Sequence, residues 1–197
     1  MTEGREVVLA SSNPGKIREF DALLSPLGWK VIAQNDLGIE GSDEPHRTFV
    51  ENALAKARHV AQRSGRPALA DDSGLCVPSL QGAPGVDSAH YAGPQRQDQD
   101  NNQALLRALS GSTERRAFYY CVLVWVMHGA DPTPCIAEGR WFGEILDAPR
   151  GAGGFGYDPL FWVPECGKTA AQMTLAEKNA KSHRARAWQS LLPFLQA

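Results

Sequence analysis

The sequence predicts an α/β fold built on a mixed sheet, and two patterns indicate it. In the first half of the chain, short apolar runs typical of buried strands alternate with helix patterns. In the second half, strand patterns follow one another closely, as they do in antiparallel hairpins. With 197 residues, 43% of them hydrophobic and 21% charged, the chain is expected to form one domain, residues 1–197. A domain of this size buries about 70% of the surface of its unfolded chain.

The elements of the first half are marked by apolar runs and capping residues. Asn13 is a preferred N-cap and Pro14 needs no donor at the first helical position, so a helix begins there. A second helix begins with a capping box at Thr48. The predicted elements are a strand over 7–10, a helix over 14–25, a strand over 30–33, the helix that follows Thr48, and a strand over 69–70 that ends at Asp71-Asp72-Ser73-Gly74.

The second half contains three further strand patterns and two helix patterns. The apolar run over residues 117–127 indicates a buried strand, because a membrane helix needs about 18 apolar residues. Strands over 134–141 and 160–163 complete the mixed sheet. Helices are predicted over 98–109 and from a capping box at Thr174 towards the C-terminus.

Charge and cysteine content argue against several classes of protein. The 20 Lys and Arg residues against 22 Asp and Glu give a net charge of −2, which argues against binding of long nucleic acid by bulk charge. The four cysteines are widely spaced and form no zinc-binding pattern. The N-terminus has no signal-peptide pattern. We therefore expect a soluble cytoplasmic protein with reduced thiols and no membrane segment.

The turn before the first helix has the residue types of a phosphate site. A helix N-terminus carries unpaired N–H groups and partial positive charge, so acidic residues are favoured in its first turn. Here Lys16 lies there instead, beside Ser11, Ser12 and Asn13. A bound phosphate would satisfy all of these groups together. The alternative is a capped surface helix with a solvated lysine.

Carboxylates suited to metal binding lie in two places. Asp71 and Asp72 are adjacent on a predicted strand and must point to opposite sides; we expect one to face a site and the other to hold backbone amides. The acidic loop before the second helix offers Glu44, and Lys56 on that helix can reach a phosphate. Mg²⁺ prefers such carboxylates together with substrate phosphates. The alternatives are an Asx-turn cap at Asp71 and a solvated acidic loop.

A stacking aromatic and a group of donors occur in the last third of the chain. The glycines around Phe155 fit the spacing of a dinucleotide-binding loop, but no helix pattern follows them, so that interpretation is rejected. Phe155 itself can stack on a base. Arg184, near Lys178 and His183, offers paired donors suited to a keto oxygen or a phosphate. With the phosphate donors and carboxylates, these residues predict a nucleoside triphosphate site.

Six segments in order resemble the inosine/xanthosine triphosphate pyrophosphatase family, over essentially the whole chain. They are Leu9-Ala-Ser-Ser-Asn-Pro-Gly-Lys16, Thr48-Phe-Val-Glu-Asn-Ala53, Ala70-Asp-Asp-Ser-Gly-Leu75, Gly82-Ala-Pro-Gly-Val86, Gly153-Gly-Phe-Gly-Tyr-Asp-Pro-Leu-Phe161, and Lys178 with Ser182-His-Arg184. The resemblance implies an elongated, twisted mixed sheet flanked by helices, with two lobes and a nucleotide site in the cleft between them.

The resemblance also implies an activity. The expected reaction is Mg²⁺-dependent hydrolysis of ITP, dITP and XTP to the monophosphate and pyrophosphate, by a homodimer. Asp72 would be the general base and a metal ligand, with Glu44 a second ligand. The substrate-binding residues would be Ser11, Ser12, Asn13, Lys16, Lys56, Ser73, Phe155, Gly156, Tyr157, Asp158, Lys178, His183 and Arg184.

Two other functions stay open at this point. A non-catalytic nucleotide-binding module needs the same phosphate and base groups but no carboxylate that activates water. A housekeeping pyrophosphatase for modified pyrimidine nucleotides would share the phosphate chemistry and differ in the base.

Overall fold

The computed structural model describes residues 5–196, which divide into two compact units. Unit 1 contains residues 5–72, 121–139 and 184–196, and unit 2 contains residues 73–120 and 140–183. The helices and longer strands are β1 (Arg5–Leu9), α1 (Pro14–Leu24), β2 (Trp29–Ala33), α2 (Phe49–Ser64), β3 (Ala68–Cys76), α3 (Asp98–Ala108), β4 (Arg116–Val126), β5 (Cys135–Ile145), β6 (Phe161–Val163), β7 (Lys168–Thr169), α4 (Leu175–Lys181) and α5 (His183–Gln196).

The described strands form one mixed sheet, as the sequence predicts. Its order is β2-β1-β3-β4-β5-β6-β7. β1 pairs in parallel with β2 and β3, whereas β6 pairs antiparallel with β5 and β7. β3, β4 and β5 each contribute residues to both units.

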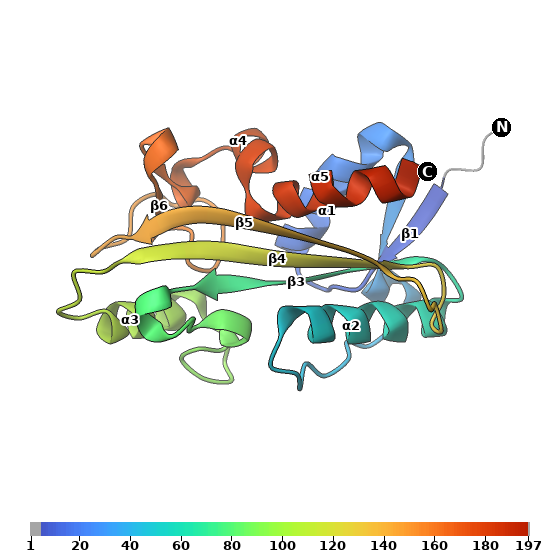
Figure 1. The fold of residues 1–197 in the computed structure, drawn as a ribbon, viewed down its shortest axis with the longest axis horizontal. Coiled ribbons are helices and arrows are strands. Elements are labelled where there is room, and N and C mark those ends of the chain that lie inside the picture. Colours follow the sequence, from blue (N-terminus) through green and yellow to red (C-terminus); the bar gives the residue numbers. More distant parts are fainter. Residues whose placement is uncertain (1–4, 197) are drawn as a thin grey trace. The chain divides into compact units, whose positions relative to one another are not determined.

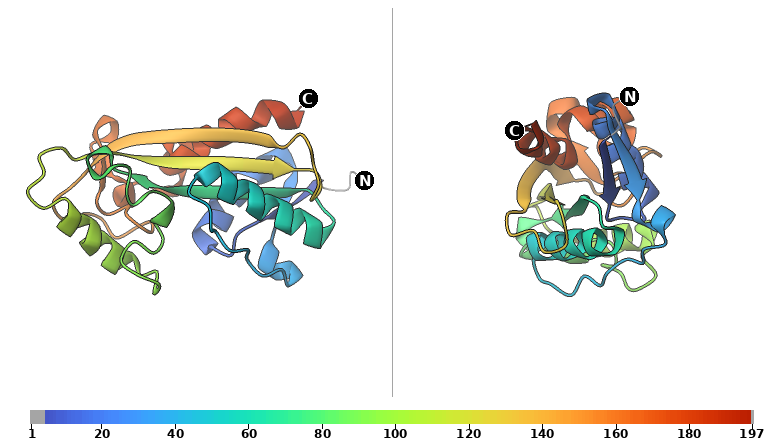
Figure 2. Two further views of the ribbon diagram at one scale, coloured as in Figure 1. Left: turned by 60° about the horizontal axis from the view of Figure 1, so that its bottom comes forward. Right: turned by 90° about the vertical axis from the view of Figure 1, so that its right-hand side faces the viewer.

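In unit 1, helices cover both faces of the sheet. Figures 1 and 2 show α1 and α5 on one side of β3 and α2 on the other. Phe20 of α1 and Trp188 of α5 pack in one cluster with Leu9 and Leu123 of the strands. α2 presents a stripe of small apolar residues, including Ala53 and Ala57, which are fully buried. Small side chains allow this helix to lie close to the strands.

Unit 2 has a core rich in aromatic residues. Tyr119, Trp141 and Phe161 pack on one another with ring centroids 4.7 to 6.3 Å apart. Leu105 and Leu109, at the C-terminal end of α3, complete this cluster. No helix among residues 5–196 is both long enough and apolar enough to cross a membrane.

Two sequence predictions about element boundaries are wrong. β3 does not end at Asp71 but continues through the Asp-Asp-Ser-Gly tetrapeptide to Cys76, because the side chains of this segment find buried partners within the fold. The last helix is two helices, since Ser182 has extended backbone angles (φ −64°, ψ 164°) and separates α4 from α5. His183 and Arg184 therefore lie in the first turn of α5. The short strand β7 has no signal in the sequence.

Candidate active site

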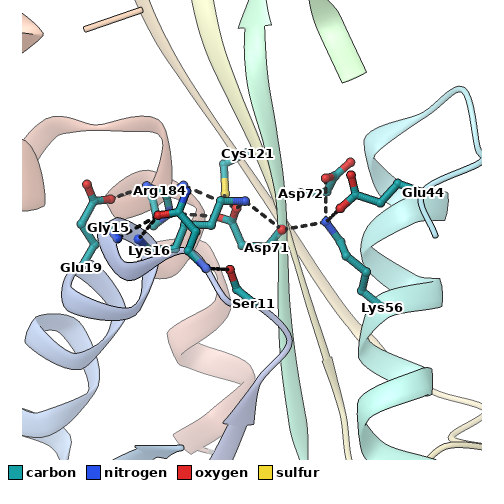
Figure 3. A network of polar contacts seen from close by, with 11 residues as sticks. Ser11, Gly15, Lys16, Glu19, Glu44, Lys56, Asp71, Asp72, Cys121 and Arg184 are labelled. Atoms are coloured by element: carbon teal, nitrogen blue, oxygen red, sulfur yellow. Dashed lines mark hydrogen bonds and ion pairs between the residues drawn. The ribbon is translucent and has the colours of Figure 1, made fainter. Parts of the chain in front are cut away.

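β3 presents its two aspartates to opposite sides, as the alternation of a strand requires. Asp71 is 1% exposed and Asp72 is 7% exposed. In Figure 3 the two carboxylates lie on either side of the β3 ribbon, Asp71 towards α1 and α5 and Asp72 towards α2. Each carboxylate has its own set of positively charged partners.

Asp71 is the centre of a buried charge cluster. Its Oδ1 lies 2.5 Å from Lys16 Nζ, and its Oδ2 accepts hydrogen bonds from Arg184 Nε at 2.8 Å and Cys121 Sγ at 3.2 Å. Arg184 also forms an ion pair with Glu19 of α1. Burial would raise the pKa of Asp71, but the charges of Arg184 and Lys16 hold that pKa well below its usual value. Asp71 is therefore ionised at neutral pH, and its carboxylate pairs with both Lys16 and Arg184.

This cluster differs from the sequence expectation for Asp71. Its carboxylate accepts hydrogen bonds from side chains of α1, β4 and α5, whereas we expected one aspartate to hold backbone amides. The Arg184 guanidinium, expected to face a keto oxygen, contacts Asp71 and Glu19 and is 2% exposed. Its contact with a purine stays a prediction.

Asp72 belongs to a second ion-pair group with Lys56 and Glu44. Lys56 Nζ lies 2.7 Å from Asp72 Oδ1 and 2.8 Å from Glu44 Oε1. Burial raises the pKa of Asp72 above its usual value, although Lys56 opposes that shift. For Lys56, burial would lower the pKa, but the two carboxylates more than compensate and raise it.

The two lysines meet at one backbone oxygen. Lys16 Nζ donates to the Asp71 carbonyl at 3.2 Å, and Lys56 Nζ donates to the same oxygen at 3.1 Å. Each ammonium group also has its own carboxylate partners, Asp71 for Lys16 and Asp72 with Glu44 for Lys56. Two ammonium donors therefore converge on one point of β3, and such donors are groups that bind phosphate oxygens.

The turn before α1 has the geometry of an N-cap. Asn13 Oδ1 accepts hydrogen bonds from the backbone N–H groups of Gly15 at 2.8 Å and Lys16 at 3.3 Å, and Ser11 Oγ accepts from Asn13 N. Ser12 is exposed in the same turn. The first turn of α1 contains no acidic residue, so its dipole faces Lys16 rather than a compensating carboxylate.

The predicted base-binding residues other than Arg184 lie in unit 2. Asp158 Oδ2 lies 2.8 Å from Lys178 Nζ and accepts a hydrogen bond from Phe155 N at 3.0 Å. The Lys178 ammonium lies over the Phe155 ring, 5.1 Å from its centroid. His183 stacks on Tyr119, with ring centroids 4.8 Å apart. Lys178 thereby links the carboxylate and the aromatic ring of one loop.

Tyr157 and Gly156, two predicted site residues of unit 2, form hydrogen bonds that each involve one backbone group. The Tyr157 hydroxyl donates to the Ser88 carbonyl at 2.9 Å, and the two peptide groups that flank the α-carbon of Gly156 bind side chains of α3. Ser73 is half-buried in β3, directly after Asp72.

Sequence reasoning missed four residues that hold these groups in place: Glu19, Cys121, Asp98 and Asn102. Asp98 had a signal, because an acidic residue in the first turn of a helix is a common feature. That signal does not identify the loop that Asp98 contacts.

The donor set near Asp72 fits a magnesium ion. Among residues 5–196, no group of three or more His, Cys, Asp or Glu side chains is arranged to hold a metal. Asp72 and Glu44, however, both place a carboxylate oxygen on the same ammonium group. Magnesium commonly uses one or two protein carboxylates and completes its shell with water and substrate phosphate oxygens, so these two residues are a sufficient protein contribution.

The fold defines an α/β protein with an open mixed sheet, and β3 carries a group of ion pairs on each of its faces. Residues 7–194 match the Ham1 family, and the chain belongs to that family. It is 60% identical over 195 residues to the dITP/XTP pyrophosphatase of Ralstonia nicotianae, covering 98% of this chain and 97% of that protein.

Two further comparisons agree. The chain is 60% identical over 192 residues to the dITP/XTP pyrophosphatase of Burkholderia pseudomallei, covering 96% of this chain and 92% of that one. Its fold is similar to that of a HAM1 protein from Coxiella burnetii, with a TM-score of 0.90, 45% identity and coverage of 98% of both chains.

Proposed function

We propose that this chain hydrolyses the noncanonical purine nucleotides ITP, dITP and XTP to the nucleoside monophosphate and pyrophosphate. The observation that carries the proposal is the pair of ammonium groups on the Asp71 carbonyl, with the Asp72 and Glu44 carboxylates beside them. Relatives 60% identical to this chain, named dITP/XTP pyrophosphatases, support the same reaction.

Lys16 and Lys56 bind the triphosphate in this proposal. Both ammonium groups lie at one point of β3 and are held by internal carboxylates. They neutralise the charge that develops on the pyrophosphate leaving group. Ser11, Ser12 and Asn13 add the hydroxyls and backbone donors of the turn before α1.

Asp72 accepts the proton of the water that attacks the α-phosphorus. The bond from water oxygen to phosphorus forms as the bond to the pyrophosphate oxygen breaks, and the proton moves to a carboxylate oxygen of Asp72. Burial raises the pKa of Asp72, which makes it a stronger base than an exposed aspartate. Asp71 cannot take this role, because both of its oxygens accept hydrogen bonds or ion pairs from cations.

Asp72 and Glu44 also hold Mg²⁺ in this proposal. When bound, the metal neutralises phosphate charge and polarises phosphoryl oxygens. Lys56 pairs with both carboxylates, so the residues that would hold the metal and a residue that would bind the phosphates lie next to each other.

The base is bound by Phe155 and by donors from several segments of the chain in this proposal. Phe155 stacks on the purine, and Lys178 and Asp158 hold the ring of Phe155 in place. Ser73, Gly156, Tyr157, His183 and Arg184 complete the nucleotide contacts. A donor from this set binds the 6-keto oxygen of hypoxanthine or xanthine, whereas the 6-amino group of adenine would place a donor against a donor. A site built on such a bond can discriminate by about 10⁴- to 10⁵-fold.

Pyrophosphate release from ITP, dITP, XTP, GTP and ATP, with and without Mg²⁺, tests the proposal. We expect release from the first three, dependent on the metal, and a loss of about 10²-fold or more in the Asp72→Asn variant. Binding of ITP without release would indicate a nucleotide-binding module. The same assay is then extended to modified pyrimidine nucleotides. A preference for those substrates would indicate a housekeeping pyrophosphatase for modified pyrimidine nucleotides.

The remaining features of the proposal concern the whole molecule. We propose that residues 1–197 act as one pyrophosphatase domain, supported by a family match over residues 7–194. A homodimer in the cytoplasm is the expected state, supported by the family resemblance and by four cysteines that form no disulfide. Light scattering of the purified protein and fractionation of cells measure these two properties.

A further inference from the structure

Helix α3 binds both backbone polar groups of Gly156, the residue that follows Phe155. The Asp98 carboxylate accepts a hydrogen bond from Gly156 N at 2.6 Å, and Asn102 Nδ2 donates to the Gly156 carbonyl at 2.8 Å. Asp98 and Asn102 are four residues apart, so they lie on the same face of the helix. The peptide group after Phe155 and the peptide group before Tyr157 are therefore both fixed by one helix.

Gly156 needs such an attachment because its conformation is one that other residues avoid. Its φ is +62°, in the left-handed region, and no atom lies within 4 Å of the position a Cβ would take. The glycine is required by the backbone angle rather than by lack of space. Glycine populates many conformations with little preference, so the two hydrogen bonds from α3 select one of them.

The attachment determines where the Phe155 ring lies. On its N-terminal side, Phe155 N donates to Asp158 Oδ2 at 3.0 Å. On its C-terminal side, the next peptide group donates to Asp98. Because the peptide groups on both sides of Phe155 are hydrogen-bonded, the Cα–Cβ bond that carries its ring has a fixed direction. Stacking on a planar ligand requires a ring plane that is held in this way.

Asp98 contacts this loop rather than its own helix N-terminus. Asp98 lies in the first turn of α3, where the N-cap residue Gln97 makes no side-chain capping bond. Asp100 lies in the same turn and is also exposed. The two acids therefore interact similarly with the helix dipole, and they differ in the hydrogen bond that Asp98 accepts from Gly156 N.

We propose that Asp98 and Asn102 are positioning residues for base recognition, acting through Gly156 on the ring of Phe155. The inference rests on the proposed function, in which Phe155 stacks on the purine. These two residues strengthen the binding of a nucleotide base and do not affect the binding of phosphate groups.

The test compares Asp98→Ala with Asp100→Ala, its matched control in the same helical turn. The substrates are ITP and inorganic tripolyphosphate, the second as a competitive inhibitor that has no base. For Asp98→Ala we expect KM for ITP to rise about 10-fold, the effect of one charged hydrogen bond. We also expect kcat to change less than about two-fold, the inhibition constant of tripolyphosphate to stay at its wild-type value, and Asp100→Ala to behave as wild type.

Two further variants keep the test independent of folding. Asp98→Asn retains an acceptor oxygen and should recover most of the lost affinity. Asn102→Asp replaces the donor by an acceptor that faces the Gly156 carbonyl, with nearly unchanged volume, and should raise KM for ITP at least as much as Asp98→Ala. Equal effects of Asp98→Ala on ITP and tripolyphosphate would overturn the inference, as would a KM that matches the Asp100→Ala control.

Calorimetric binding of ITP separates this inference from the proposed function. A wild-type chain that binds ITP without releasing pyrophosphate refutes the proposed activity, and the affinities of the variants still decide the role of α3. A chain that neither binds nor hydrolyses ITP refutes both.

Discussion

Replacing Asp71 by alanine should destabilise the protein strongly, because the carboxylate neutralises a buried guanidinium. Arg184 is 2% exposed, and Asp71 supplies one of its two carboxylate partners, at 2.8 Å. Removing one partner of a buried ion pair costs about 3–5 kcal/mol. Without Asp71, Arg184 keeps one carboxylate partner, Glu19, and Lys16 loses its ion pair as well. For a chain of this size, about 2–4 °C is lost per kcal/mol, so we expect the melting temperature to fall by about 6–20 °C.

The measurement is urea unfolding followed by circular dichroism, with thermal unfolding as a second probe. The control is Glu114→Ala, which removes an exposed partner of Arg116 at 2.7 Å and should leave the midpoint of urea unfolding close to its wild-type value. Asp71→Asn keeps two polar atoms but loses the charge, so its stability should lie between those of Asp71→Ala and Glu114→Ala. If Asp71→Ala lowers the free energy of unfolding by less than about 1 kcal/mol, the argument that Asp71 compensates the buried charge of Arg184 is refuted.

Three other predictions follow from the described contacts. Lys56→Met removes an ammonium that we assign to the triphosphate and should raise KM for ITP by about 10- to 100-fold, measured by pyrophosphate release. Asp131→Asn should cost about 1–3 kcal/mol in urea unfolding, because Asp131 accepts from the backbone N–H groups of both Met127 and Thr133 and an amide nitrogen cannot. Hydrogen bonds from Lys168 and from the Thr174 backbone lower the pKa of Glu177 to about 2, against 4.5 unperturbed; its stabilising effect is therefore present above pH 4.5 and lost as the pH falls towards 2. Glu177→Gln should flatten the dependence of stability on pH in that range, and an unchanged curve would contradict this assignment.

Local signals in the sequence were sufficient for most elements. The N-cap at Asn13 and the cap at Thr48 are where the sequence predicts them, with side-chain oxygens that accept from the backbone of the following turn. The capping box at Thr174 is also confirmed. These motifs depend only on residues within one helical turn, so the sequence contains all the information needed to predict them.

Partners distant in the sequence could not be predicted in this way. Arg184 and Glu19 are 165 residues apart, and no local pattern relates them. The Asp-Asp-Ser-Gly segment has strong turn propensity, but its two aspartates form ion pairs with lysine and arginine side chains of other elements. These tertiary contacts outweigh the local preference for a turn. No local pattern predicts the extended backbone of Ser182, which separates α4 from α5.

The point where Lys16 and Lys56 meet is a main-chain oxygen, and this has a consequence for where damaging mutations can occur. No substitution at residue 71 removes that oxygen, so its position depends on the register of β3 against its neighbours β1 and β4. Against β1, Val8 lies opposite Ala68 and Leu9 opposite Leu69. A slip of one residue would turn every side chain of β3 to the opposite face. Asp72 would then face α1 and Asp71 would face α2, exchanging the two sets of cations. An insertion or deletion that shifts this register should therefore abolish the arrangement of charges even though it leaves every residue of the site unchanged.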